Sequence, residues 1–150
     1  MADFLKHIVP LDHIPVLFDV DEPDGLVLHL RLPSRSRRKF LVKKHTKRGG
    51  ELDNFSYSDE LMREACIGFE GLTPKWLGDH APHVFTPEAV RAMEAELQLE
   101  GETGYAFSPE RLAQLLEHVS SFSVRLSELL DAENGAQRVQ EAAEAHRKKT

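Results

Sequence analysis

Histidine and carboxylate side chains near the middle of the chain have a spacing that suits metal binding. Asp79, His80 and His83 form a D-H-x-x-H cluster, and ligands three residues apart lie on one face of a helix. Pro82 interrupts this cluster, however, and no further histidine or cysteine is close in sequence. We therefore interpret the cluster as a polar loop and predict no metal site.

Nucleophilic and cofactor chemistry is also not indicated. Cys66 is the only cysteine, which excludes a disulfide within the chain and a cysteine-rich zinc module. It lies on an apolar stripe, as a buried structural thiol does. The acidic run 19–24 lacks the spacing and terminal glutamate of a calcium loop. No phosphate-binding, nucleophile-elbow or dinucleotide-binding motif occurs, so the sequence predicts no catalytic or cofactor site and a protein that is not an enzyme.

The composition is that of an ordinary folded domain. The chain has 150 residues, of which 41% are hydrophobic and 29% charged, enough to bury a core without disulfides. Residues 1–10 carry Asp3 and Lys6 and do not resemble a signal peptide. No run approaches the roughly 20 apolar residues of a membrane span. These features predict a cytoplasmic protein without a membrane partner.

Charge is distributed very unevenly along the chain. The 19 basic and 25 acidic residues give a net charge of −6. Residues 31–48 hold nine basic residues and no acid, so the remainder holds ten basic against 25 acidic residues, a net charge of −15. The candidate partner-binding residues come from this segment: Arg35, Arg37, Arg38, Lys39, Lys43 and Lys44.

Three interpretations of the basic segment remain open. It can be a solvated face that pairs with the protein's own acids. It can bind an acidic protein or a second copy of this chain. It can also bind nucleic acid, because clustered cations release counterions from phosphates. Phe40 is its only aromatic residue, so no stacking platform for single strands is visible. The overall pI near 5.7 also makes nucleic acid unlikely as the partner.

The first structural element expected is a β-hairpin within residues 14–32. Residues 14–20 form a short apolar run, a turn cluster ends in Asp24-Gly25, and leucines alternate with other residues over 26–32. A lone hairpin is marginal in water, so it must pack on other elements.

The helical elements follow the hairpin. Ser34 is expected to cap a basic helix to Lys47 with Phe40 and Leu41 inward, although a basic strand is the alternative. Residues 56–69 predict a helix with an apolar stripe, which Gly71 ends as a C-terminal cap.

Two later segments share the pattern Phe, Thr or Ser, Pro, Glu, any residue, aliphatic. They are Phe85–Val90 and Phe107–Leu112. The hydroxyl residue can cap a helix, proline suits the first helical position, and the glutamate suits the positive end of the helix dipole. Phe85 with Val90, and Phe107 with Leu112, then form hydrophobic staples. This pattern predicts helix starts at Pro87 and Pro109.

The remaining expectations concern the end of the chain and the overall architecture. The helix from Pro87 should bury Val90, Met93 and Leu97, and the apolar stripe from Pro109 should continue to Leu130 as a kinked or second helix. Residues 132–150 are expected to be an exposed C-terminal helix or a flexible tail. The sequence thus predicts an α+β domain over residues 1–131, with an N-terminal hairpin packed on four to six helices.

This order of elements resembles the tail assembly chaperones of long-tailed bacteriophages. The resemblance covers about residues 14–131 and rests on three motifs. They are the basic L-P-S-R-x-R-R segment at Leu32–Arg38, the Cys66–Leu72 stretch C-I-G-F-E-G-L, and the Phe107–Leu112 helix start followed by Leu115-Leu116. Many such chaperones have a Trp where this chain has Phe69, and residues 73–104 are longer than expected.

The resemblance implies a non-enzymatic assembly factor in the host cytoplasm. Such chaperones bind the tape measure protein, help to recruit tail tube subunits, form oligomers and are generally absent from the finished particle. Two other functions stay open: a structural tail or connector protein kept in the virion, and a small nucleic-acid-binding regulator. The motif residues expected to be structural are Cys66, Gly68, Phe69, Gly71, Phe85, Pro87, Phe107, Pro109 and Leu112.

The uneven charge also predicts self-association through unlike surfaces. The basic segment of one copy would meet the acidic body of another, and the apolar face of the hairpin would supply most of the affinity. Such a head-to-tail contact builds rings or open filaments.

Overall fold

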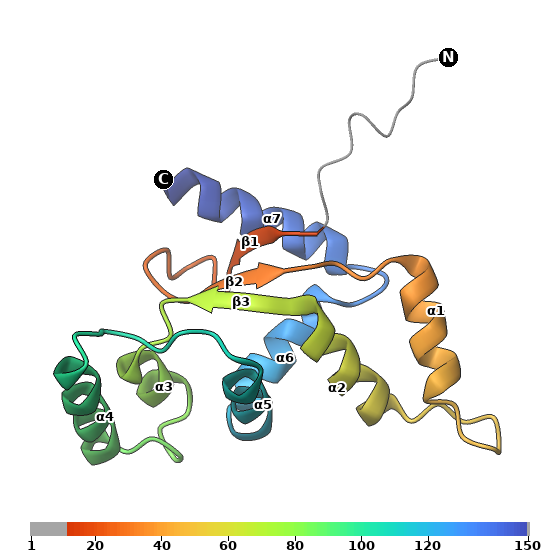
Figure 1. Cartoon of the computed structure of the whole chain (residues 1–150). Helices are drawn as coiled ribbons and strands as arrows, with labels where there is room; N and C mark the ends of the chain where they lie inside the picture. Colours follow the sequence, from red (N-terminus) through yellow and green to blue (C-terminus); the bar gives the residue numbers. More distant parts are fainter. Residues whose placement is uncertain (1–11, 150) are drawn as a thin grey trace.

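The computed structural model describes residues 12–149, which form a three-stranded antiparallel sheet and seven helices (Figure 1). The predicted α+β class is confirmed, with seven helices in the described range instead of four to six. The elements are β1 (Ile14–Leu17), β2 (Val27–Leu30), α1 (Arg35–Lys44), α2 (Asn54–Ala65), β3 (Cys66–Glu70), α3 (Pro74–His80), α4 (Pro87–Leu99), α5 (Pro109–His118), α6 (Ser120–Leu129) and α7 (Gly135–Lys149).

The predicted hairpin is present, and β2 is the central strand of the sheet. β2 pairs antiparallel with β1 on one side and with β3 on the other, where Leu28 lies opposite Phe69. β1 ends at Leu17 and β2 begins at Val27, so the connection between them is longer than the expected turn. The backbone N–H of Phe18 donates to the carbonyl of Leu26 at 2.9 Å and closes its base.

The predicted helix over residues 56–69 is wrong in its last part. α2 ends at Ala65, and the chain continues directly as β3. Leu61 and Ala65 are buried on one stripe as expected, but Cys66 and Phe69 reach the core from the sheet. The i, i+4 spacing of these apolar residues therefore concealed a change from helix to strand.

Gly71 consequently does not cap a helix. It follows β3 with a φ of +82°, and an added Cβ would lie 3.0 Å from the carbonyl oxygen of Gly25. Glycine is required there by both the left-handed backbone and the close approach. Gly68, in β3, lies opposite His29.

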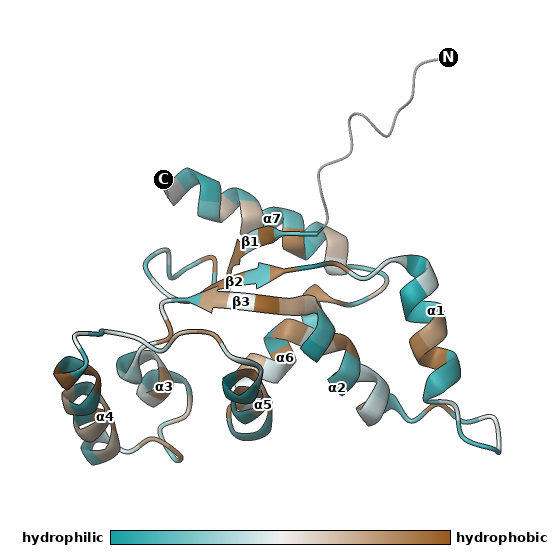
Figure 2. Ribbon diagram, viewed as in Figure 1, coloured by the Kyte–Doolittle hydropathy of each residue, from teal (hydrophilic) through white to brown (hydrophobic). Residues whose placement is uncertain are grey.

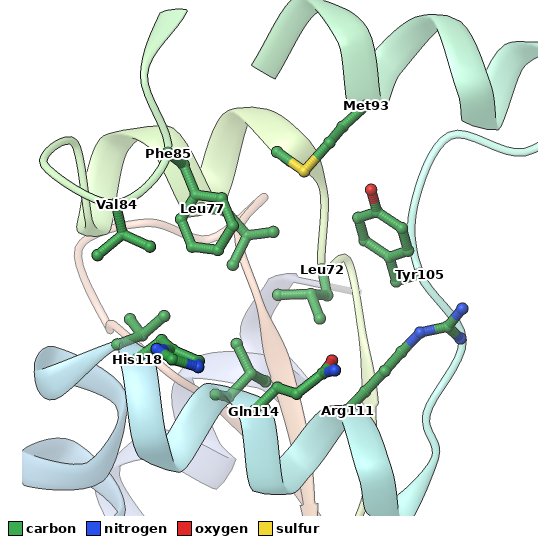
Figure 3. Close-up of a pocket in the computed structure, with 11 residues that line it drawn as sticks. Leu72, Leu77, Val84, Phe85, Met93, Tyr105, Arg111, Gln114 and His118 are labelled. Atoms are coloured by element: carbon green, nitrogen blue, oxygen red, sulfur yellow. The ribbon is translucent and has the colours of Figure 1, made fainter. Parts of the chain in front are cut away.

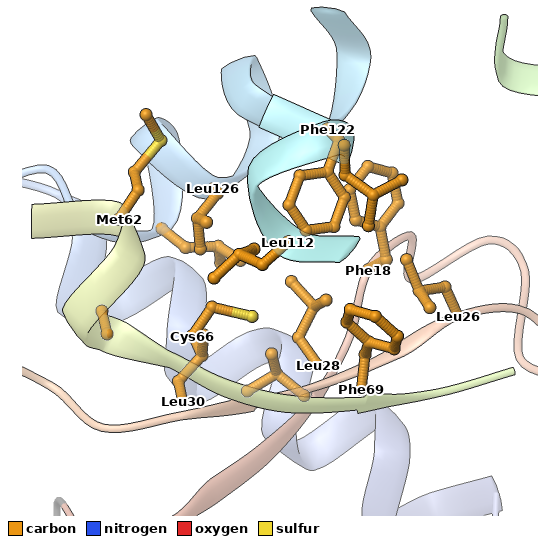
Figure 4. Packing of buried hydrophobic residues seen from close by; sticks show 14 of the residues in the cluster. Phe18, Leu26, Leu28, Leu30, Met62, Cys66, Phe69, Leu112, Phe122 and Leu126 are labelled. Carbon is orange, nitrogen blue, oxygen red and sulfur yellow. The ribbon is translucent and has the colours of Figure 1, made fainter. Parts of the chain in front are cut away.

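Helices cover both faces of the sheet. α7 lies along β1 on one face, and α5 and α6 lie on the other (Figures 1 and 4). Figure 4 shows Leu28, Cys66 and Phe69 rising from the sheet toward Phe122 and Leu126 of α6. Because both faces are covered, the apolar face of the hairpin is not available to a second copy, and that part of the self-association hypothesis is wrong.

The expectation of an exposed C-terminal helix or flexible tail is also corrected. α7 packs against β1, and Val139, Ala142 and Ala143 are all buried. Small side chains allow a helix to approach a sheet closely, so a face with little apolar volume still completes the core.

The helix starts predicted from sequence are confirmed. The hydroxyls of Ser34, Thr86 and Ser108 each accept from a backbone N–H three residues later, and proline occupies the first turn of α4 and α5. α3 was missed, although Thr73 caps it in the same way before Pro74.

α4 is less buried than its pattern predicts. Leu97 is buried, whereas Val90 and Met93 are only half-buried. α4 packs on α3, where Gly78 leaves room for Val90: a Cβ at Gly78 would lie 2.7 Å from Cγ2 of that valine. The two helices form an arm at one end of the molecule (Figure 1).

Candidate partner-binding surfaces

The basic segment folds into α1 and projects from the end of the molecule opposite to α4 (Figure 1). The Ser34 hydroxyl accepts from the N–H of Arg37 at 3.1 Å and starts the helix, and Leu41 is its only buried residue. Figure 2 shows α1 as mostly hydrophilic, with one hydrophobic band. A single apolar anchor therefore fixes this helix and leaves most of its surface to solvent.

Part of the basic segment is neutralised by α2. Arg37 pairs with Glu64 and lies 3.7 Å from Glu60, and Lys44 donates to Glu60 at 2.9 Å. The ring of His45 lies 2.8 Å from the same Glu60 oxygen. Hydrogen bonds from Lys44 and then His45 lower the pKa of Glu60, which stays ionised. The pairing with the protein's own acids thus applies to Arg37 and Lys44.

A second part of the segment is not neutralised by any of the described residues. Arg35, Lys39 and Lys43 are exposed, stand four residues apart, and form no ion pair with any residue in 12–149. Arg38 is half-buried and also has no ion pair in that range. Like charges at i, i+4 destabilise a helix slightly. We call the row Arg35, Lys39 and Lys43 the basic face.

The expectation that Phe40 points inward is wrong. Its side chain is 53% exposed, and the guanidinium of Arg37 lies 4.8 Å from the centre of its ring. Val42 is exposed as well. The surface of α1 therefore offers a charged row flanked by apolar side chains.

A pocket of about 430 Å³ lies between the α3–α4 arm and α5 (Figure 3). Figure 3 shows Met93, Phe85 and Leu77 on one side and Gln114, Arg111 and His118 of α5 on the other. The apolar side chains that line it are Leu72, Leu77, Val84, Phe85, Met93, Leu115 and Val119. Its interior is apolar, and its polar groups lie on one wall.

The polar wall is organised around Arg111. One guanidinium nitrogen donates to the carbonyl of Ala106 at 2.8 Å, and the guanidinium lies 5.3 Å from the ring centre of Tyr105. Burial raises the pKa of Tyr105, and the negative charge of Glu96 adds to the rise. The phenol is therefore neutral near pH 7, and Tyr105 is part of the pocket wall.

The residues of this pocket were not predicted as a site from sequence. They come from 72–119, a stretch that includes the whole of the unexpectedly long 73–104 segment. Thr73-Pro74 is the one local signal that an additional helix lies there, and it repeats the cap pattern of the later helices.

Two of the motifs that contain residues predicted to be structural meet in the fold. Phe69 of β3 packs edge to face on Phe107, with ring centres 5.1 Å apart. The N–H of Tyr105 donates to the carbonyl of Leu72 at 2.7 Å. The second and third motifs are therefore joined by side-chain and backbone contacts, beside the pocket.

Cys66 is buried in β3, and its thiol lies 3.6 Å from the carbonyl oxygen of Gly68. Burial raises the pKa of this thiol to about 12. It is therefore protonated near neutral pH and does not act as a nucleophile.

The D-H-x-x-H cluster is not the simple loop that was expected. Asp79 and His80 belong to the last turn of α3, and the His80 ring stacks on Trp76 at 4.1 Å between centres. His80 Nε2 also lies 3.6 Å from Glu22. Within residues 12–149, no group of three histidine, cysteine or carboxylate side chains is placed to hold a metal ion. No helix in that range is long and apolar enough to cross a membrane.

Comparisons with models of protein families, with curated proteins and with solved structures found no match for this chain. Its function must therefore be argued from its motifs and surfaces.

Proposed function

We propose that this chain is a tail assembly chaperone of a long-tailed bacteriophage. In this role it binds the tape measure protein and helps to recruit tail tube subunits in the host cytoplasm, without catalysing a reaction. The motif resemblance over residues 14–131 is the starting point. The contact between Phe69 and Phe107 supports it, because it makes two of the three motifs parts of one structural unit.

The pocket beside those motifs is the observation that carries the proposal. An amphipathic helix binds such a groove by inserting apolar side chains at i, i+3, i+4 and i+7. The tape measure protein is a long helical protein in the phages that the resemblance indicates. The apolar lining would receive one such face, and Arg111 and Gln114 would meet the polar groups beside it.

The test is co-expression with the tape measure protein encoded in the same phage genome. We expect the chain to keep that protein soluble and to co-purify with it. Met93→Glu places a charge in the pocket at a half-buried position and should abolish co-purification. Val124→Glu is the matched control, because Val124 is exposed and lies outside the pocket.

A wild-type chain that neither binds nor solubilises the tape measure protein would overturn the proposal. Equal binding by the Met93→Glu variant would exclude the pocket as the docking site. Mass spectrometry of purified particles separates the chaperone from a structural tail or connector protein, since a chaperone should be absent from them. Gene order gives an independent check: we expect a tube gene upstream and a very long tape measure gene downstream.

A further inference from the structure

Positive and negative charges are separated in space as well as in sequence. Residues 31–64, which include α1 and α2, hold ten basic and five acidic residues, a net charge of +5. The other residues in 12–149 hold eight basic and nineteen acidic residues. Because α1 projects from one end of the molecule (Figure 1), the overall pI near 5.7 averages over surfaces that face different surroundings. It therefore does not exclude a polyanion at this end.

The acids nearest to α1 are already engaged. Glu60 and Glu64 pair with Lys44 and Arg37. Asp53 caps the N-terminus of α2, and its hydrogen bonds there lower its pKa, so this carboxylate stays ionised and bound to the helix. Few carboxylates are left to neutralise the remaining cations of this end.

Seven of these cations make no ion pair with any residue in 12–149, and six of them are exposed. We call them the basic end: Arg31, Arg35, Arg38, Lys39, Lys43, Lys47 and Arg48. The basic face of α1 is its centre, where the i, i+4 spacing sets the charges about 6 Å apart along the helix axis. Cations at this spacing repel one another, so a bound polyanion would relieve that repulsion.

The apolar side chains of α1 do not form a membrane-binding face. Phe40 and Val42 are exposed but two residues apart, which places them about 200° apart around the helix, on opposite sides of the basic face. Leu41 is buried. A helix that lies in a membrane surface needs its apolar residues on one face. α1 lacks such a face, so its exposed cations are not those of a lipid-inserting helix.

Phosphates reward this arrangement more than carboxylates do. An exposed ion pair between two side chains contributes little to binding. Closely spaced phosphates hold condensed counterions, which clustered lysine and arginine side chains release on binding. α1 is about 10–12 Å wide with its side chains, and the major groove of DNA is about 12 Å wide. A single strand would need a row of aromatic side chains for stacking, and Phe40 is the only aromatic residue in 31–48.

We propose that the basic end binds the phosphates of duplex DNA, with α1 lying along the major groove. Contacts to phosphates position a protein without reading sequence, and α1 has no Asn or Gln to read adenine. Binding is therefore independent of base sequence. The acidic remainder of the molecule repels the duplex, which confines the contact to this end. The property goes beyond the proposed chaperone function and uses a surface remote from the pocket.

Fluorescence anisotropy with a labelled duplex of mixed sequence tests the proposal on the full chain. A duplex of about 30 base pairs spans three helical turns. We expect a dissociation constant in the micromolar range at about 50 mM salt, as for other sequence-independent binding. If four to six phosphates are neutralised, the plot of log K against log salt concentration has a slope of about −4 to −5. Affinity should then fall at least about a hundredfold between about 50 and 200 mM salt.

Neutralising the basic face should change that slope by a defined amount. The variant carries Arg35→Gln, Lys39→Gln and Lys43→Gln, and glutamine keeps a high helix propensity. Loss of three phosphate contacts should make the slope less steep by about 2.7 and weaken binding at about 50 mM salt at least tenfold.

A control variant carries Lys75→Gln, Arg91→Gln and Lys148→Gln, three exposed cations outside the basic end. It makes the same change in net charge and should keep the wild-type slope. Thermal melts of both variants check that they fold, as expected for exposed positions.

A wild-type chain that does not bind the duplex at about 50 mM salt would overturn the proposal. So would a folded basic-face variant with the wild-type slope, a control variant that loses as much, or tighter binding to a single strand of the same length. Poly-glutamate that displaces the duplex at equal charge concentration would assign the basic end to an acidic protein. Retention on phosphatidylglycerol vesicles without duplex binding would assign it to a membrane. The basic-face variant should still co-purify with the tape measure protein, so the two proposals fail separately.

Discussion

Substitution of Phe107 measures how strongly the Cys66–Leu72 and Phe107–Leu112 motifs stabilise each other. Its side chain is half-buried and packs edge to face on Phe69, which is only 5% exposed. Truncation of a fully buried Phe to Ala costs about 3–5 kcal/mol. Because Phe107 is partly exposed, we expect Phe107→Ala to cost about 2 kcal/mol, less than a fully buried phenylalanine would.

A double-mutant cycle isolates the contact between the two rings. Phe69→Leu, Phe107→Leu and the double variant should give a coupling free energy of about 0.5–1.5 kcal/mol, the range for aromatic pairs. Urea denaturation followed by far-UV circular dichroism measures the free energy of unfolding for each protein. Phe55→Ala is the matched control, since Phe55 is 80% exposed and should change stability by less than about 0.5 kcal/mol.

The reasoning would be refuted by a coupling energy below about 0.3 kcal/mol, which is the scatter expected for independent sites. It would also fail if Phe107→Ala cost no more than Phe55→Ala. Either result would mean that the two motifs are adjacent without stabilising each other.

Local signals explain which elements the sequence predicted correctly. A hydroxyl residue before proline satisfies an orphan backbone N–H and fixes the first helical φ without help from the rest of the chain. The starts of α4 and α5 were therefore predictable from Thr86-Pro87 and Ser108-Pro109 alone. The hairpin was equally predictable, because its alternating leucines and its turn residues are contiguous in sequence.

β3 and α7 depend on partners that are distant in sequence. Cys66–Glu70 becomes a strand because β2 offers an unpaired edge, and its apolar spacing also fits a continued helix. α7 has mostly small residues on its buried face, so its sequence gives little sign of burial. Contact with β1, more than 100 residues earlier in the chain, makes Val139 and Ala142 part of the core.

The candidate surfaces also combine features that local sequence shows with features that depend on contacts between distant residues. Segregation of charge was visible in the sequence, and it identified the segment that becomes α1. The sequence did not show which cations α2 would neutralise, because Glu60 and Glu64 reach Lys44 and Arg37 only through the packing of two helices. The pocket was not predictable either, since its walls come from three helices whose packing no local motif encodes.

Two further substitutions test the local physics of the fold. Gly71→Ala should cost more than about 1 kcal/mol in urea denaturation, because it forces a left-handed residue against a carbonyl, whereas Gly49→Ala meets open space and should be nearly neutral. Glu60→Gln should lower the melting temperature at pH 7. The Lys44 hydrogen bond lowers the pKa of Glu60 in the folded state, so the ionised carboxylate adds stability above its unfolded pKa and loses it as pH falls through the folded one. The difference between variant and wild type should therefore shrink on acidification below the range where free glutamate titrates. Glu117→Gln is the control: Glu117 is exposed, so this variant should melt at the same temperature as the wild type at every pH. A Glu60→Gln variant as stable as the wild type at pH 7, or a deficit that persists unchanged in acid, would show that this carboxylate does not hold α1 to α2.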